Sequence, residues 1–186
     1  MAYNLKDVFY LDTSAKIDNA TAGGGSAQLD LSAYIDPIAR GRTKGTGLAI
    51  YKAHFMVSQS ANGEPIDDAE AGTFRAALLA GAGLGDIATG GVAFGGNFMS
   101  DYSNLVINLY DFYGPAMPNA GSATMYNDIL MPSTEVPYIV VRDNVCLLYD
   151  VGDNFVTDHD ITVRLEVAQV SLDQATLNQL LRTQTV

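Results

Sequence analysis

Hydrophobic residues recur at every second position in three stretches of the sequence, and this period constrains the fold more than any other feature. Successive side chains of a β-strand point to opposite faces of its sheet, so the pattern predicts strands with one buried face. The expected buried faces are Ala27, Leu29, Leu31 and Ala33 in 26–34; Ala49, Tyr51, Ala53, Phe55 and Val57 in 47–59; and Ile161, Val163, Leu165 and Val167 in 160–170.

Further strands are predicted where aromatic and β-branched residues cluster without a clear period. They are 7–11, 103–113, 137–141 and 145–150, with a weaker candidate at 90–99. The pair Asp143-Asn144 separates two of these runs, and both residue types tolerate turn geometry. It therefore predicts a hairpin between the strands at 137–141 and 145–150.

Two segments carry helix signals. Residues 67–81 begin with acids and end at Gly81, which predicts a helix with a glycine cap. The tail 171–184 has a capping-box pattern at Ser171 and Gln174. Leu177, Leu180 and Leu181 form an apolar stripe on that second helix, which needs a surface to cover it.

These elements predict an all-β sandwich or barrel, because short strands follow one another without the long helices of a βαβ fold. The 186 residues are expected to form one domain over 1–186, with the β core at about 27–170 and the helix at 171–184. Hydrophobic residues make up 48%, enough for a sizeable core, whereas only 17% are charged.

The net charge of −11 argues against direct nucleic-acid binding by the surface as a whole, since like charges repel. Seventeen of the acids are Asp and four are Glu, and only four residues are Lys. This bias is typical of proteins from saline habitats, and an ordinary acidic protein accounts for it equally well. We expect no signal peptide and no membrane span, because no apolar run approaches ~20 residues.

Seven glycines crowd into 77–96, at 81, 83, 85, 90, 91, 95 and 96. A dinucleotide fingerprint needs G-x-G-x-x-G between a strand and a helix, but here Asp86 occupies the third glycine's place. The glycines are therefore expected to allow tight turns and close backbone approach, for instance against a neighbouring subunit.

No residue pattern predicts catalysis, and we expect neither an enzyme nor a cofactor. The single cysteine, Cys146, lies in an apolar run and is expected to be a buried, inert thiol. Four acids form the one candidate metal site, for a hard cation such as Ca²⁺, although their spacing is not that of an EF-hand. They are Asp150, Asp153, Asp158 and Asp160.

The strand pattern resembles the single jelly-roll major capsid proteins of icosahedral viruses. The membrane-containing viruses of haloarchaea and thermophilic bacteria, the sphaerolipovirus type, are most similar in size and composition. The resemblance covers about 27–170 and rests on "AQLDLSAY", "GLAIYKAHFMVSQ", "NLVINLYDFYG" and "DITVRLEVAQV". No family motif matches position by position.

The resemblance implies an all-β single jelly roll that forms homo-oligomeric capsomers, with or without a second, related capsid protein. The protein would be assembled in the host cytoplasm and reside in the virion. It would contact no nucleic acid directly and the internal membrane only indirectly. We expect its interfaces in the loop 81–96, the arm 114–136 and the C-terminal helix, at Gly83, Gly85, Phe94, Met117, Tyr126, Leu177, Leu180 and Leu181.

Two other functions remain open. One is a different virion or surface β-domain, such as a spike, tail or adhesin. The other is a ligand-binding or carbohydrate-binding jelly roll, which requires a concave pocket with convergent polar groups.

Overall fold

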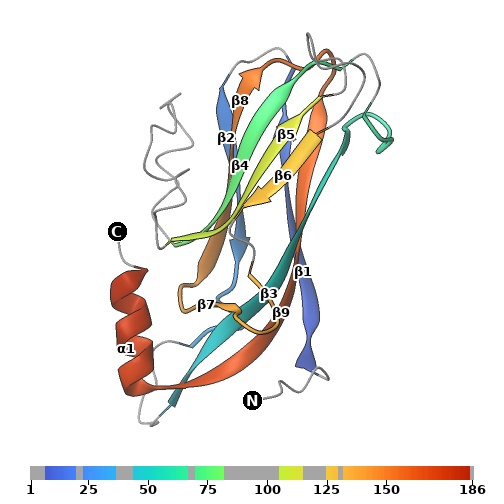
Figure 1. The fold of residues 1–186 in the computed structure, drawn as a ribbon. Coiled ribbons are helices and arrows are strands. Elements are labelled where there is room, and N and C mark those ends of the chain that lie inside the picture. Colours follow the sequence, from blue (N-terminus) through green and yellow to red (C-terminus); the bar gives the residue numbers. More distant parts are fainter. Residues whose placement is uncertain are drawn as a thin grey trace.

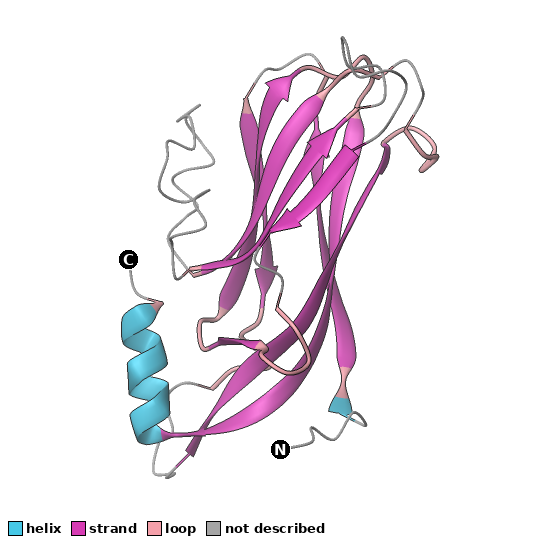
Figure 2. Cartoon of the chain, in the orientation of Figure 1, coloured by secondary structure: helices cyan, strands magenta, loops and turns pink. Residues whose placement is uncertain are grey.

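Nine strands in two antiparallel sheets and one helix make up the part of the chain that the computed structural model describes (Figure 1). This part is 7–19, 23–36, 44–66, 70–81, 105–114, 125–129 (backbone only) and 132–184. The elements are β1 (Phe9–Ile17), β2 (Gly24–Asp30), β3 (Lys44–Gln59), β4 (Thr73–Ala80), β5 (Val106–Tyr113), β6 (Met125–Ile129), β7 (Tyr138–Val140), β8 (Asn144–Asp153), β9 (His159–Asp173) and α1 (Gln174–Thr183). The predicted all-β class is confirmed, and α1 continues directly from β9 (Figure 2).

The order of the strands is that of a jelly roll. Sheet A has the order β1-β9-β3-β7 and sheet B the order β2-β8-β4-β5-β6. The antiparallel pairs are nested along the chain, β1 with β9, β2 with β8, β3 with β7 and β4 with β5. A long hairpin rolled around itself gives this nesting, and it is the jelly-roll arrangement of a two-sheet sandwich.

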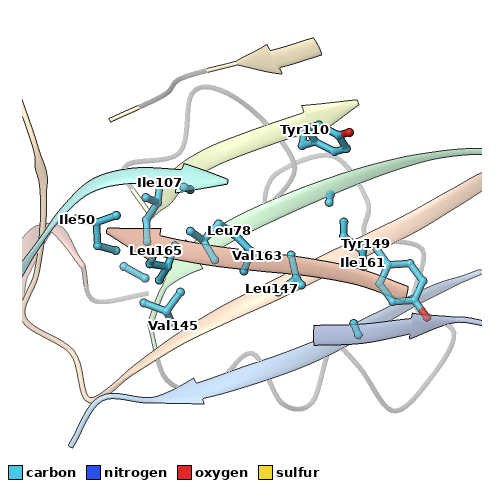
Figure 3. Packing of buried hydrophobic residues seen from close by; sticks show 14 of the residues in the cluster. Ile50, Leu78, Ile107, Tyr110, Val145, Leu147, Tyr149, Ile161, Val163 and Leu165 are labelled. Atoms are coloured by element: carbon cyan, nitrogen blue, oxygen red, sulfur yellow. The ribbon is translucent and has the colours of Figure 1, made fainter. Parts of the chain in front are cut away.

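The main core lies between the two sheets. Ile50 and Leu165 of sheet A meet Leu78, Ile107 and Val145 of sheet B there (Figure 3). Burying one such side chain stabilises the fold by about 1.5–3 kcal/mol. The alternation predicted for 160–170 is confirmed, since its four apolar residues Ile161, Val163, Leu165 and Val167 are all 0% exposed.

The helix predicted over 67–81 is wrong. Its described part from residue 73 onward is β4, the strand between β8 and β5, and Ala76–Ala80 are all 0% exposed. A strand buried on both faces has no polar alternation, and alanine and leucine in succession also suit a helix. Pairing on both edges, for instance of Ala77 with Leu109 and Leu148, overrides that propensity.

The hairpin predicted at Asp143-Asn144 is also wrong. The two strands exist, but β7 belongs to sheet A and β8 to sheet B. The turn therefore crosses from one sheet to the other. Its far end is fixed by β2, because Leu31 N–H donates to Asp143 O at 2.7 Å and Asp30 pairs with Asn144.

A β-bulge changes the faces predicted for 47–59. The register of β3 against β9 shifts between Ile50 and Lys52. Ile50 and Ala53 therefore both face the main core, whereas Ala49 and Tyr51 belong to a separate cluster. A bulge inserts one extra residue, so the parity of the side chains reverses across it.

Other boundaries differ by a few residues. β1 extends to Ile17, and β2 ends at Asp30, so that Ala33 lies exposed in the turn after it. A short strand, β6, was not predicted and lies within the expected contact arm. The weak strand candidate at 90–99 lies outside the described residues.

Candidate functional site

Three of the eight residues predicted at an interface have described side chains, all in α1. Gly83, Gly85, Phe94 and Met117 lie outside the described residues, and Tyr126 lies in β6, where only the backbone is described. Leu177 is 1% exposed, whereas Leu180 and Leu181 are half-buried. Leu177 therefore packs α1 onto its own domain, and the other two leucines leave apolar surface accessible.

Both ends of α1 are fixed by side chains. The predicted capping box at Ser171 and Gln174 is wrong, because β9 extends to Asp173. Asp173 is the N-cap, and its carboxylate accepts from Thr176 N–H at 2.8 Å. At the other end, Gln184 is 3% exposed and bonds to β7 and the residue after it. The helix is thus a fixed part of the domain.

The outer face of sheet A is apolar at one end and polar at the other. Ala49, Tyr51 and Ala168 are buried there, packed against the half-buried Val8, Ile139 and Val170. Beyond the bulge the same face is polar, and His54 Nε2 lies 2.8 Å from Glu166 Oε1. The bulge at Tyr51 therefore marks the boundary between an apolar and a charged part of one surface.

The outer face of sheet B also carries an apolar cluster. It comprises Ala77, Leu79, Val106, Leu109, Cys146 and Leu148, which are 0–6% exposed. Their chain neighbours Leu78 and Leu147 face the main core, so the cluster points away from the sandwich interior. Both sheets of this domain thus bury apolar side chains on both faces.

The predicted inert thiol belongs to this second cluster. Cys146 is 0% exposed, and burial raises its pKa to about 11. Little of it is therefore thiolate at neutral pH, which is the form that reacts with electrophiles.

A polar hollow of about 330 Å³ opens at the end of sheet B near Gly152. Arg75 is its centre and bonds to both oxygens of Asp111, through Nε at 2.5 Å and Nη2 at 2.7 Å. Asp150 lies opposite Arg75 on the other neighbouring strand. The hollow presents one guanidinium between two carboxylates, a pattern suited to a small polar or cationic group.

A second hollow, of about 460 Å³, lies where β1, β3 and the β8–β9 turn meet. Asp158 bonds to Asn19 N–H at 3.0 Å and to Lys16 Nζ at 2.6 Å. The Asn19 N–H first, and the Lys16 side chain second, hold the pKa of Asp158 below its usual range. Asp160 accepts from Ser60 Oγ at 2.9 Å.

The four acids of the candidate metal site are thus not gathered at one point. Asp150 lines the first hollow, Asp158 lines the second and Asp160 lies beside it, and Asp153 lies at the end of β8 with its N–H bonded to Thr73. Across the described ranges, no three His, Cys, Asp or Glu side chains are placed to hold a metal ion. The described helix is also too short and too polar to span a membrane.

A buried carboxylate fixes the β8–β9 turn. Glu70 is 1% exposed and accepts from Val156 N–H at 2.6 Å, Thr157 N–H at 3.1 Å and Thr157 Oγ1 at 2.6 Å. His159, 0% exposed, lies beside it with Nε2 3.9 Å from Glu70 Oε1. Its Nδ1 is 2.8 Å from Thr157 O, which can only accept, so Nδ1 carries a proton.

Neither this pair nor Gln184 was predicted from the sequence. Glu70 fell within the false helix, and Gln184 follows a polar helix end without a motif. Only the fold brings Glu70 next to residues 156–159, and Gln184 next to Ile139.

Comparison with known proteins adds no identity. No protein-family model matches the chain, and no curated protein is similar to it.

Proposed function

We propose that this protein is a structural subunit of a virion, a major capsid protein whose copies associate into the capsomers of an icosahedral shell. The observation that carries the proposal is the set of apolar side chains on the outward faces of both sheets, combined with the nested jelly-roll order. Double-sheet jelly rolls occur in viral capsids, lectins and cupins, so the fold alone does not select among them.

The outward apolar residues favour protein–protein contact. An isolated antiparallel sandwich normally has polar outer faces. Here the outer face of sheet A carries half-buried Val8, Ile139 and Val170, and α1 adds Leu180 and Leu181. Side chains left partly accessible in this way gain free energy when a neighbouring subunit covers them.

The charge of the chain adds an ionic condition to such assembly. Copies that each carry a net charge of −11 repel one another at low ionic strength. At about 1 M salt the Debye length falls to roughly 3 Å, so only charges in contact still interact. We therefore expect association to strengthen with salt.

The same proposal covers partners and location. A second, related capsid protein would complete the lattice, while the acidic surface would keep the chain from direct contact with the genome. An internal membrane would be reached only through such partners.

The runner-up is a ligand-binding or carbohydrate-binding jelly roll, and the hollow around Arg75, Asp111 and Asp150 favours it. Its volume of about 330 Å³ lies at the lower limit for small-molecule pockets. A spike, tail or adhesin domain shares the structural role, but no described feature favours it over a shell subunit.

The test is the native mass of the protein, measured by light scattering behind size exclusion in about 0.1 M and about 1 M NaCl. We expect discrete oligomers that grow with salt. A Leu180→Asp variant should shift the mass toward the monomer, and Gln179→Asp is its matched control, because that neighbour is exposed on the same helix. A monomer at every salt concentration would contradict the proposal and direct attention to the hollow at Arg75.

A further inference from the structure

The outermost strand of sheet A, β7, has one backbone edge that no strand of the described chain covers. On its other side it pairs with β3, for instance Val140 with Leu48. An uncovered strand edge presents N–H and C=O groups to which another chain can add, and natural proteins normally obstruct it. Val136, two residues before β7, is apolar and 75% exposed, so this region also offers a side chain to a partner.

The side chain of Gln184 occupies this edge. Its Nε2 donates to Ile139 O at 2.6 Å, and its Oε1 accepts from Val141 N–H at 3.1 Å. These two backbone groups lie two residues apart on the same side of the strand. One residue of an added parallel strand would bond to the same two groups. The carboxamide therefore replaces one peptide unit of a missing neighbour strand.

Gln184 is held in this position by α1 and by the residue after Val141. Its own N–H donates to Leu180 O at 2.9 Å, which closes the helix end, and its carbonyl accepts from Arg142 Nε at 2.9 Å. A buried side chain with this many bonds occupies one position. The edge is thus closed for as long as α1 remains docked.

We infer that the β7 edge is a strand-addition surface for a second copy of this chain, and that α1 keeps it closed through the Gln184 carboxamide. A second copy is the fitting partner because its strands are extended segments that are present wherever this edge is. Strand addition uses backbone bonds and is therefore distinct from the contacts proposed for Leu180 and Leu181. The inference does not depend on the capsid proposal.

The experiment removes the carboxamide by Gln184→Ala and compares Gln179→Ala, an exposed glutamine of α1 that serves as the control. Hydrogen exchange of the Val141 amide and native mass against concentration are both measured in about 0.1 M NaCl. We expect exchange about tenfold faster or more in Gln184→Ala, and a mass that rises to that of a dimer or larger. The control should match the wild type in both.

Two further variants separate strand addition from misfolding and from contact through the leucines. Gln184→Glu keeps the shape of the side chain but cannot donate to Ile139 O, so it should also expose the edge if Gln184→Ala fails to fold. The double variant Gln184→Ala/Leu180→Asp should still associate, since strand addition does not use the leucine surface. Faster Val141 exchange without a rise in mass would overturn the inference, and so would association that Leu180→Asp abolishes.

Discussion

Replacing Glu70 by Gln should destabilise the protein by far more than a single Glu-to-Gln change usually does. Its carboxylate is 1% exposed and is the acceptor for two backbone N–H groups and one hydroxyl of the β8–β9 turn. The amide keeps one oxygen, but its NH₂ group must face a backbone N–H of Val156 or Thr157. The change also removes the negative charge beside His159.

The magnitude follows from these contacts. A hydrogen bond to a charged group contributes about 1.5–3 kcal/mol, and breaking a buried charge pair costs about 3–5 kcal/mol. We therefore expect a loss of about 3 kcal/mol in the free energy of unfolding. For a chain of this size that corresponds to a fall of roughly 6–12 °C in Tm.

The assay is urea unfolding followed by circular dichroism, with calorimetry for Tm. Glu64→Gln is the matched control, because Glu64 is exposed and its carboxylate bonds only to Asn62 among the described residues. It should change the free energy of unfolding by less than about 0.5 kcal/mol. A Glu70→Gln protein as stable as that control would refute the reasoning that this carboxylate fixes the turn.

Three other predictions rest on buried or bonded polar groups. Asn108→Leu should stabilise the protein by about 1–3 kcal/mol in urea unfolding, because Asn108 is 0% exposed and its amide has no hydrogen-bond partner in the described structure; a loss of stability would show that the amide is satisfied. Cys146 should resist thiol reagents at about pH 8 until the protein unfolds, since a pKa of about 11 leaves roughly a hundredfold less thiolate than usual. That raised pKa stabilises the fold below the ordinary thiol pKa, and the contribution is lost as the pH rises toward 11; rapid labelling of the native protein would contradict burial. The lowered pKa of Asp158 acts at the other end of the pH scale, stabilising the fold above the ordinary carboxyl pKa and losing effect as the pH falls through its folded value. Asp158→Asn should therefore flatten the acid limb of a stability–pH profile, and an unchanged limb would contradict the bonds to Asn19 and Lys16.

Strands with one buried face were predictable because their side-chain pattern repeats the geometry of the sheet. The segment 160–170 is the clearest case, since each of its four apolar residues faces the main core. The segment at β4 could not be predicted in this way. It is covered on both faces, and an apolar run without a period is compatible with a helix or a strand.

Errors of face and partner arose where the structure depends on contacts between distant segments. The bulge beside Tyr51 has no local signature, so the period before it was extended across it. The turn at Asp143 has suitable residues for a hairpin, but which sheet accepts each strand depends on β2 and β3. Turn chemistry predicts where a chain reverses and not which strand it joins.

The candidate site shows the same limit. The leucine stripe of α1 was predictable from its helical spacing, and the structure distinguishes buried Leu177 from half-buried Leu180 and Leu181. The bond between Glu70 and Val156 spans 86 positions of the chain, and the bond between Gln184 and Ile139 spans 45. Single side chains brought together over such distances leave no pattern in the sequence.

Electron microscopy of the purified protein in about 1 M NaCl tests the central claim most directly. The account predicts closed shells or rings of discrete size, built from upright jelly-roll subunits, that dissociate when the salt is removed. A field of single subunits at every salt concentration would contradict it, and so would open fibres of variable length.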